Sequence, residues 1–325
     1  MRIGIDVSPL RQTRAGTARY LRGLLPELER LVDVEPLAWG GSRKAATVAR
    51  DVWWYPLELP RRARGLDVLH CPSFRGPLRA PAAPLVLTVH DLAVLRHPNT
   101  FNRWTRTYSR LLVPRVVHAA QRVIAVSDFT KRELLDVLEI PEERIRVIPN
   151  AVAKPFVPDG GRAEGEYVLA VGTREPRKNL PRLAEAARLA GVELRVAGGQ
   201  GWGNADVHGE GVRVLGYVDD EELARLYRGA LCVAYPSLYE GFGIPVLEAL
   251  ACGAPVVTSA GSAMAEVADG AAVLVDPHDA GAIADGIREA IGRREELASL
   301  GPERAQRFTW QAAAEATAAV YRELA

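Results

Sequence analysis

Apolar runs alternate with amphipathic stretches along nearly the whole chain, and this pattern predicts a parallel α/β fold. Residues 1–10 are mainly apolar and predict a strand, and residues 14–28 predict a glycine-containing loop followed by an amphipathic helix. Comparable segments follow further along the chain: LVLTVHDLAV, RVIAVSDFTKREL, RVIPNAV, YVLAVGTREPRKNL and VRVLGYVDDEELARLY. Strands that alternate with helices in this order are typical of doubly wound, nucleotide-binding sheets.

A stretch rich in proline and glycine divides the pattern in two. Residues 153–166, AKPFVPDGGRAEGE, contain two prolines and three glycines and have no apolar period, which predicts a hinge. A chain of 325 residues is long for one core and comfortable for two. We therefore expect Rossmann-like domains at 1–152 and 153–308, followed by a helix at 309–325. Its apolar face has helical spacing and consists of Trp310, Ala314, Thr317 and Tyr321.

The net charge of +1 conceals an uneven distribution. Residues 1–152 carry 24 Lys and Arg against 15 Asp and Glu, whereas residues 153–325 carry 17 against 25. A basic first half suggests an anionic acceptor or a membrane surface as partner, and no nucleic acid is expected. Arginines on solvated helix faces would give the same balance, so both interpretations stay open.

Several classes of protein are disfavoured by what the sequence lacks. No window approaches the roughly 18 uninterrupted apolar residues of a membrane span, and the first residues do not resemble a signal peptide, so we expect a cytoplasmic protein. Three cysteines without CxxC or His-Cys spacing make a disulfide framework or a zinc site improbable. We expect Cys232 and Cys252 to be buried as small apolar residues.

The most informative segment is residues 235–257, YPSLYEGFGIPVLEALACGAPVV, in which Glu240 and Glu248 flank a glycine-rich entry into a short helix. Gly243 permits a tight turn, and Pro245 suits the first helical position because its missing amide hydrogen would have no partner there. The amides and positive dipole end of such a helix can bind a diphosphate, and carboxylates can accept hydrogen bonds from sugar hydroxyls. The segment predicts a site for a nucleotide-linked sugar.

The spacing of Glu240 and Glu248 resembles the paired-glutamate motif of the family 4 retaining glycosyltransferases, which have the GT-B fold. The other strand and helix segments look like family segments in family order over roughly residues 1–325. The resemblance implies two facing Rossmann-like domains with a deep cleft between them, the first for the acceptor and the second for the donor. It also implies that the last helix crosses back onto the first domain.

The resemblance assigns the donor site residue by residue. Glu240 would hold hydroxyls of the transferred sugar, and Glu248 would hold the ribose hydroxyls. Three residues would lie near the base: Gly216, Tyr217 and Val218. The helix entry would face the donor diphosphate: Gly241, Phe242, Gly243, Ile244 and Pro245.

Lys178 stands out even without a family, because arginine outnumbers lysine by 37 to 4 in this chain. It follows the turn after a predicted strand, where a compact ammonium can reach a phosphate, and in similar enzymes it binds the donor diphosphate. A surface lysine at the start of a helix is the structural alternative. Many family members have an arginine where this chain has Thr173, so Arg174 is either the second phosphate-binding cation or a solvent-exposed residue.

Five further positions match family positions at the ligand cleft. Gly16 corresponds to a glycine that lies against the diphosphate, and His90, after a buried strand, to a histidine near the reacting carbon. Asp91 could fix the tautomer of His90 or cap the next turn. Ser127 and Asn150 match cleft positions, although each could equally cap a helix or turn.

The segment 97–117 has a mixed composition that bears on membranes. One helical face is expected to carry Phe101, Trp104, Tyr108 and Leu111, and another to carry Arg103, Arg106 and Arg110. Residues 53–64, WWYPLELPRRAR, repeat the mixture. An aromatic core stripe with solvated arginines is one interpretation, and contact with anionic lipid or a polyprenyl-phosphate acceptor is the other.

The sequence thus predicts a retaining hexosyltransferase that uses a nucleotide-diphosphate sugar, with His90, Lys178 and Glu240 at the catalytic centre. The segments GTREPRKN and FGIPVLEA resemble those of mannosyltransferases, so GDP-mannose is the first expected donor and UDP-glucose another. The acceptor would be a glycan, a lipid-linked glycan precursor or a small molecule, with peripheral membrane attachment as one location. No metal or other cofactor is expected. A nucleotide-sugar epimerase and a non-catalytic donor-binding homologue remain as alternatives.

Overall fold

The computed structural model describes residues 1–12, 16–40, 49–98, 101, 103–201 and 207–325. The chain forms two compact units. The first comprises Met1–Pro98, residues 103–151 and Thr309–Ala325, and the second contains Val152–Phe308.

The first unit is built on a six-stranded parallel sheet with the order β2-β1-β3-β4-β5-β6. Its strands are β1 (Arg2–Asp6), β2 (Asp33–Leu37), β3 (Val68–Cys71), β4 (Leu85–Val89), β5 (Arg122–Ala125) and β6 (Ile145–Val147). Every residue of β3 and β4 is buried, as expected for strands covered on both faces.

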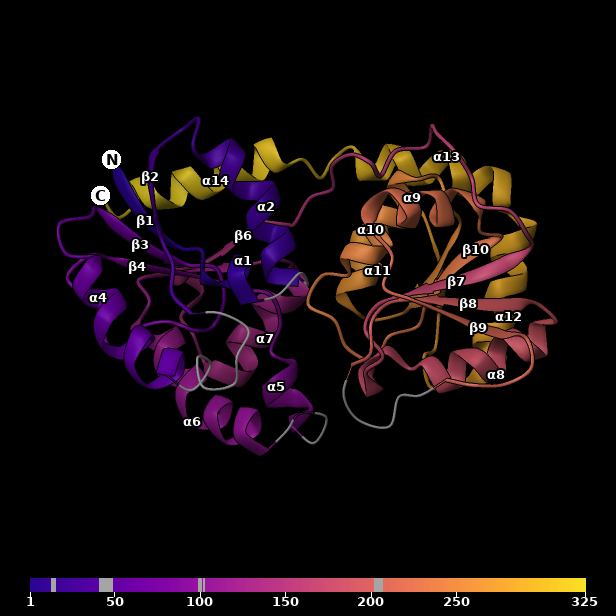
Figure 1. Cartoon of the computed structure of the whole chain (residues 1–325), viewed down its shortest axis with the longest axis horizontal. Coiled ribbons are helices and arrows are strands. Elements are labelled where there is room, and N and C mark those ends of the chain that lie inside the picture. The colour runs from indigo at the N-terminus through magenta and orange to yellow at the C-terminus, as the bar shows by residue number, and fades with distance from the viewer. Residues whose placement is uncertain (13–15, 41–48, 99–100, 102, 202–206) are drawn as a thin grey trace. The chain divides into compact units, whose positions relative to one another are not determined.

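Helices connect these strands, and the last helix of the chain belongs to the same unit. The helical segments are α1 (Ser8–Gln12), α2 (Gly16–Leu28), η1 (Arg50–Glu58, a π-helix), α4 (Leu59–Arg62), α5 (Ala93–Arg96), α6 (Arg103–Ala119), α7 (Asp128–Leu138), η3 (Glu142–Arg144, a 3-10 turn) and α14 (Trp310–Arg322). Figure 1 shows α14 in yellow beside α2 in indigo, in keeping with their direct packing.

The second unit repeats the architecture with the order β12-β11-β10-β7-β8-β9, again all parallel. Its strands are β7 (Tyr167–Val171), β8 (Glu193–Ala197), β9 (Val212–Gly216), β10 (Cys232–Tyr235), β11 (Val256–Ser259) and β12 (Val273–Val275). Its helical segments are η4 (Pro176–Lys178, a 3-10 turn), α8 (Leu180–Ala190), α9 (Asp220–Gly229), α10 (Ile244–Ala251), α11 (Ala263–Ala268), α12 (Ala280–Gly292) and α13 (Arg294–Ala305). The predicted pair of doubly wound parallel sheets is confirmed.

The strand order of each unit identifies where its ligand can bind. In the second unit the chain proceeds from β7 outward through β8 and β9, and then returns to place β10 on the other side of β7. Loops diverge at such a reversal and leave a crevice at the carboxyl ends of the two strands. The corresponding reversal in the first unit lies between β1 and β3.

Two details differ from the sequence expectations. Leu111 is 55% exposed in α6, while Ser109, Val113 and Val117 are buried, so Leu111 does not belong to a core-facing stripe. Small and β-branched residues face the sheet because they allow close helix packing. The side chains of Arg103, Trp104 and Tyr108 lie outside the described residues. Pro245 is the second residue of α10 rather than the first.

The cysteine expectation is confirmed. Cys71, Cys232 and Cys252 are free and buried. Burial raises the pKa of both Cys232 and Cys252 to about 12, so these thiols stay protonated and apolar. None of the helices in the described ranges is long and apolar enough to cross a membrane.

Candidate functional site

Two loops at the carboxyl ends of β7 and β10 bring Lys178 and Glu240 into contact. The first loop ends in the 3-10 turn that carries Lys178, and the second leads from β10 into α10. The ammonium Nζ of Lys178 lies 2.6 Å from Oε1 of Glu240, although 62 positions separate the residues. Both side chains are about nine-tenths buried, so Lys178 is not the surface lysine of the structural alternative.

Glu240 is the centre of a buried polar cluster. Its Oε1 accepts hydrogen bonds from Lys178, from Arg177 at 2.5 Å, from the Tyr235 hydroxyl at 3.1 Å and from the Ser237 hydroxyl at 3.0 Å. Burial alone would raise the pKa of this carboxyl, but the charges of Arg177 and Lys178 outweigh burial and lower the pKa to about 2. Among the described residues these contacts all fall on Oε1, which leaves Oε2 for another donor.

Lys178 keeps capacity for a ligand in this arrangement. An ammonium has three hydrogens to donate, and Lys178 uses two of them, one on Glu240 and one on the hydroxyl of Tyr235, whose ring also lies 4.7 Å from Nζ. Burial lowers the pKa of Lys178, while Glu240 opposes this effect. One donor on a buried cation is thus left for an anion at the strand ends.

Arg177 is a site residue that the sequence interpretation missed. Its guanidinium spans two carboxylates, with Nε 3.0 Å from Glu175 Oε2 and Nη1 2.5 Å from Glu240 Oε1. Glu175 in turn accepts a hydrogen bond from Thr173 at 2.5 Å. The only signal in the sequence was the position of Arg177 next to Lys178, in a composition where arginine is too common to attract notice.

Arg174 lies in the same turn, and its side chain is partly buried. Its backbone amide donates to the Gly199 carbonyl at 3.2 Å, and its Nε is buried without a hydrogen-bond partner among the described residues. The backbone at position 201 lies close to the backbone of Arg174, and only glycine fits there, because a Cβ at that position would lie 2.3 Å from the Arg174 carbonyl oxygen. A donor without a partner among the described residues is compatible with an anion-binding role.

The entry into α10 is held tightly against α11. Gly241, Phe242 and Gly243 are buried, and Gly243 has φ +93°, a conformation that favours glycine. A Cβ on Gly243 would meet the Met264 side chain at 2.7 Å. Ile244 and Pro245 then begin the helix, so its first amides lie at the carboxyl end of β10.

Glu248 lies one turn into α10 and is 1% exposed. It accepts a hydrogen bond from the hydroxyl of Tyr227 in α9 at 3.1 Å. The second carboxylate of the motif is therefore anchored by a neighbouring helix, apart from the Lys178–Glu240 cluster. The three residues predicted near the base lie at the carboxyl end of β9: its last residue Gly216 with φ +75°, then Tyr217, which is 62% exposed, and the partly buried Val218.

In the first unit, His90 and Asp91 follow β4 and line a cavity of about 240 Å³ at the carboxyl ends of the strands. Nε2 of His90 lies 3.0 Å from the Pro72 carbonyl oxygen, which fixes the proton on Nε2 because a carbonyl only accepts. Burial lowers the pKa of His90, so the ring is neutral. Asp91 accepts from the Ala93 amide at 2.9 Å, and thus caps the next turn instead of fixing the tautomer of His90.

A charged network forms the opposite wall of this cavity and was not predicted. Asp51, which is 3% exposed, accepts through Oδ1 from both Arg50 and Arg75. Arg50 also donates to the amide oxygen of Gln12. Oδ2 of Asp51 is buried without a hydrogen-bond partner among the described residues. These residues come from segments 63 positions apart, which explains why no linear motif indicated them.

The remaining predicted positions have the following environments. The Ser127 hydroxyl accepts from the Thr130 amide at 2.9 Å and caps α7, the structural role that the sequence left open. Asn150 is 2% exposed, and its Oδ1 has no hydrogen-bond partner among the described residues. Gly16 begins α2, and a Cβ there would meet no atom of the described residues within 4 Å.

Comparison with family models covers most of the chain. Residues 158–307 match the model for glycosyl transferases group 1, and residues 15–154 match the model for glycosyltransferase family 4. The chain is also 33% identical over 276 residues to the O-antigen chain mannosyltransferase B of Escherichia coli, which covers 75% of this chain and 71% of that protein. The chain belongs to glycosyltransferase family 4.

Other relatives of this glycosyltransferase agree with that assignment. It is 30% identical over 276 residues to the MMP alpha-(1->4)-mannosyltransferase of Mycolicibacterium hassiacum, covering 73% of this chain and 65% of the relative. Among solved structures, the sucrose-phosphate synthase of Thermosynechococcus elongatus aligns with a TM-score of 0.79 at 20% identity, over 100% of this chain and 99% of that one. The likeness shows the GT-B fold, and the predicted family and fold are confirmed.

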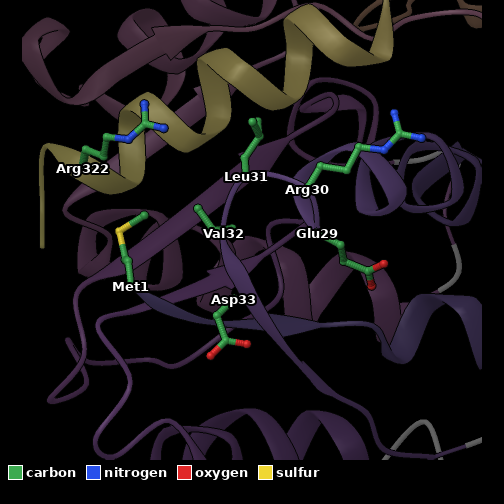
Figure 2. Close-up of a pocket in the computed structure, with 7 residues that line it drawn as sticks. All are labelled: Met1, Glu29, Arg30, Leu31, Val32, Asp33 and Arg322. Atoms are coloured by element: carbon green, nitrogen blue, oxygen red, sulfur yellow. The ribbon is translucent and has the colours of Figure 1, made fainter.

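A second hollow of the glycosyltransferase lies away from these loops. Figure 2 shows Met1, Asp33 and Arg322 around a volume of about 450 Å³ at the amino ends of β1 and β2. Ligands of doubly wound sheets bind at the carboxyl ends of the strands, so this hollow is not the candidate active site. In the part of the chain that the structure describes, no cluster of His, Cys, Asp and Glu has the arrangement of a metal site.

Proposed function

We propose that this glycosyltransferase transfers a hexose, with mannose as the first candidate, from a nucleotide-diphosphate sugar to an acceptor hydroxyl with retention of configuration. The second unit would hold the donor, and the first unit would hold the acceptor in the cavity beside His90. The observation that carries the proposal is the contact of Lys178 and Arg177 with Glu240 at the strand ends.

This cluster has the charges that the donor requires. The leaving diphosphate gains negative charge as the glycosidic bond breaks, and the third hydrogen of Lys178 can donate to it at that moment. Arg177 adds a second, partly buried cation, and the Nε of Arg174, which has no partner among the described residues, adds another donor in the same turn. A buried ion cluster contributes little net stability, because desolvation offsets attraction, so a ligand-binding role explains it better.

The two carboxylates are assigned different parts of the donor. Oε2 of Glu240 would accept hydrogen bonds from hydroxyls of the transferred sugar, while Lys178 and Arg177 keep the carboxylate ionised. Glu248 would accept from the ribose hydroxyls, with Tyr227 fixing its orientation. Gly216, Tyr217 and Val218 would lie near the base, and the first amides of α10 near the diphosphate.

The proposed chemical step exchanges one glycosidic bond for another. The bond from the anomeric carbon to the diphosphate oxygen breaks, and a bond to the acceptor oxygen forms on the same face of the sugar. The proton of the acceptor hydroxyl passes to the leaving phosphate oxygen, so atoms and charge balance without a protein nucleophile. The neutral His90, with its proton fixed on Nε2, would contact the sugar through Nδ1.

Mannose is favoured over other hexoses by two relatives, whose names describe mannosyltransferases. The Lys178–Glu240 cluster does not identify the base, because in the proposed complex it contacts only phosphate and sugar hydroxyl groups. The direct test is thermal stabilisation by a panel of nucleotides, because a ligand that binds the native state raises the unfolding midpoint by mass action. We expect GDP and GDP-mannose to give the largest shift, and a larger shift with UDP would replace mannose by a UDP-linked sugar.

Product analysis separates transfer from the two alternatives. A nucleotide-sugar epimerase would form a new epimer from donor alone, whereas the proposed transferase needs an acceptor to form a glycoside. A non-catalytic homologue would bind donor and form neither product. Glycoside formation that depends on both Lys178 and Glu240 would support the proposal, and turnover of donor to its epimer without acceptor would contradict it.

A further inference from the structure

The π-helix η1 exposes a compact apolar face that the donor chemistry does not use. Val52 is 60% exposed, Trp53 42% and Leu57 63%. They are three of the ten exposed large apolar side chains of the described residues, and they lie within six positions. Isolated exposed apolar residues are common on protein surfaces, whereas a cluster of this kind indicates a binding surface.

The helix geometry explains why these three residues share one face. A π-helix has about 4.4 residues per turn, so residues four or five positions apart line up, and Leu57 lies over both Val52 and Trp53. The opposite face carries the fully buried Trp54 and Tyr55. The exposed face is therefore a regular side of a well-packed helix.

Exposed arginines follow this face closely in the chain. Arg61 and Arg64 are exposed directly after η1, and Arg62 lies over the Trp54 ring at 5.4 Å while it pairs with Glu58 at 2.8 Å. The basic excess of residues 1–152, 24 Lys and Arg against 15 Asp and Glu, extends this local pattern. An occupant of the surface must accept apolar side chains and also provide negative charge.

We propose that the exposed face of η1, formed by Val52, Trp53 and Leu57 with Arg61 and Arg64 beside it, docks on an anionic lipid bilayer. The aliphatic side chains enter the boundary of the acyl region, Trp53 lies at the headgroup level that tryptophan prefers, and the arginines contact lipid phosphates. The bilayer supplies both required properties at once, whereas a protein partner would have to match them side chain by side chain.

Docking has a consequence for the proposed acceptor, and this step rests on the proposed function. Arg50 and Tyr55, on the inner face of η1, line the 240 Å³ cavity assigned to the acceptor. The surface that meets the bilayer and the wall of the cavity are thus two faces of one helix. An acceptor anchored in the membrane by a lipid tail would reach the cavity along this helix.

The experiment measures partitioning of the full chain onto vesicles of phosphatidylcholine with and without phosphatidylglycerol. The variant V52S/L57S replaces only exposed side chains, and its binding to anionic vesicles should fall at least about tenfold. Neutralisation in R61Q/R64Q should lower binding about 30-fold, which corresponds to about 1 kcal/mol per arginine near the surface. The matched control is L189S/L274S, two leucines of the second unit with 42% and 47% exposure, and it should bind like the wild type.

Nucleotide-induced thermal stabilisation of each variant separates this proposal from the proposed function. We expect the donor shift to be unchanged in V52S/L57S, since no residue of the Lys178 cluster is altered. Wild-type protein that ignores anionic vesicles, or variants that bind as well as the control, would overturn docking while leaving the transferase proposal intact. Conversion of an oligomer to a monomer by V52S/L57S, with vesicle binding unaffected, would instead assign the face to a protein contact.

Discussion

The carboxylate of Glu240 illustrates how a residue can be costly to bury and still be retained. Removing one partner from a buried ion cluster leaves an uncompensated charge, which destabilises proteins by about 3–5 kcal/mol, although the intact cluster contributes little. Glu240 is held by Lys178, Arg177, Tyr235 and Ser237, so its oxygen Oε1 is fixed before any ligand arrives. A carboxylate fixed in advance loses less conformational freedom when sugar hydroxyls bind to it.

The depressed pKa of Glu240 predicts a specific acid sensitivity. The folded pKa of about 2 lies below the ordinary value of 4.5, so the unfolded chain binds more protons between these values and stability falls as the pH falls. The free energy of unfolding of the wild type should drop more steeply than that of Glu240→Gln between pH 4.5 and 2, by on the order of 1 to 3 kcal/mol. Denaturant titrations followed by circular dichroism at several pH values provide the measurement. Parallel pH profiles would show that Glu240 is not held ionised by its neighbours.

Lys178→Ala and Glu248→Gln should impair the proposed reaction in different ways. Loss of Lys178 removes a charge that matters more as the diphosphate leaves than while it is esterified, so kcat should fall by a larger factor than donor affinity. Glu248→Gln weakens a ribose contact present throughout the reaction and should raise the donor KM, at a cost of about 1.5 to 3 kcal/mol. Steady-state kinetics with varied donor and saturating acceptor distinguish these outcomes.

Surface substitutions serve as controls for these two variants. Lys131→Ala removes a lysine whose side chain pairs with Glu142 far along the chain from the donor loops, and should leave both kinetic constants unchanged. Circular dichroism must show that each variant is folded. Near-normal kcat in Lys178→Ala would remove this lysine from the leaving group and make Arg177 the first replacement to examine.

Single residues were predictable where a local pattern or the family resemblance singled them out, as with Lys178 and Glu240. Arg177 was missed because the chain has thirty-six other arginines, so that one more does not stand out in the sequence. Its importance comes from its contact with Glu240, 63 positions further along the chain. Asp51 and Arg75 were missed for the same reason, since their contact joins η1 to the loop after β3. A linear pattern does not report contacts that depend on how loops fold over a sheet.

At the scale of elements, the packing of α14 on α2 depends on the absence of one side chain. Gly23, in the middle of α2, lies directly under the indole of Trp310, and a Cβ at that position would be 2.0 Å from ring atom Cε2. The Trp310 ring also meets the Tyr20 ring edge-on, with centroids 5.9 Å apart. The tryptophan can lie close to the helix backbone only because residue 23 is glycine.

Gly23→Ala should therefore destabilise the first unit, although alanine ordinarily favours a helix by about 1 kcal/mol over glycine. The clash forces the indole or the helix to move, and overpacking of this kind costs about 1–3 kcal/mol. The comparison is Gly292→Ala near the end of α12, where a Cβ meets no atom within 4 Å and the substitution should be neutral or stabilising. The unfolding midpoints of both variants are measured by thermal unfolding. A midpoint for Gly23→Ala equal to that of Gly292→Ala would contradict tight packing at Gly23.

The hydrophobic pattern predicted strands and helices well where one periodicity applied throughout. It was less informative for residues 50–58, because a π-helix does not follow the 3.6-residue period from which an apolar face is usually read. The tryptophans at positions 53 and 54 illustrate the difficulty, since one is 42% exposed and its neighbour is fully buried. In α6 the large side chain of Leu111 is exposed although a core-facing stripe was one interpretation, because size alone does not decide which residues pack on a sheet.

At the scale of the whole molecule, the order of strands determines where chemistry can occur. In both sheets the strand order reverses next to the first strand, and Lys178, Glu240 and His90 follow strands at or next to that reversal. This much follows from alternating strands and helices, so the sequence could predict two such folds. The pairing of loops across a reversal could not be predicted without the family, because it depends on loop conformations that no periodicity encodes.

The proposed donor site neutralises phosphate with side-chain cations and helix amides, so activity should persist in excess EDTA. Lys178 and Arg177 already pair with the carboxylate of Glu240, which disfavours a divalent cation at the same oxygen. Transferase assays with and without chelator measure this directly. Complete loss of activity, restored by Mg²⁺ or Mn²⁺, would show that the diphosphate is neutralised by a metal instead.

The return of α14 to the first unit has a consequence for synthesis on the ribosome. Most of that unit emerges first, but the helix that covers Gly23 and Tyr20 emerges only after Val152–Phe308 have been made. At roughly 5–20 residues per second, the surface beneath α14 stays open for roughly 8 to 30 s. Nearly all of the second unit is the continuous segment Val152–Phe308, so it can finish folding before the first unit does. A nascent chain can therefore contain a folded second unit while its first unit still lacks α14 and exposes apolar surface. Chaperones that bind exposed apolar surface would bind the first unit during that interval.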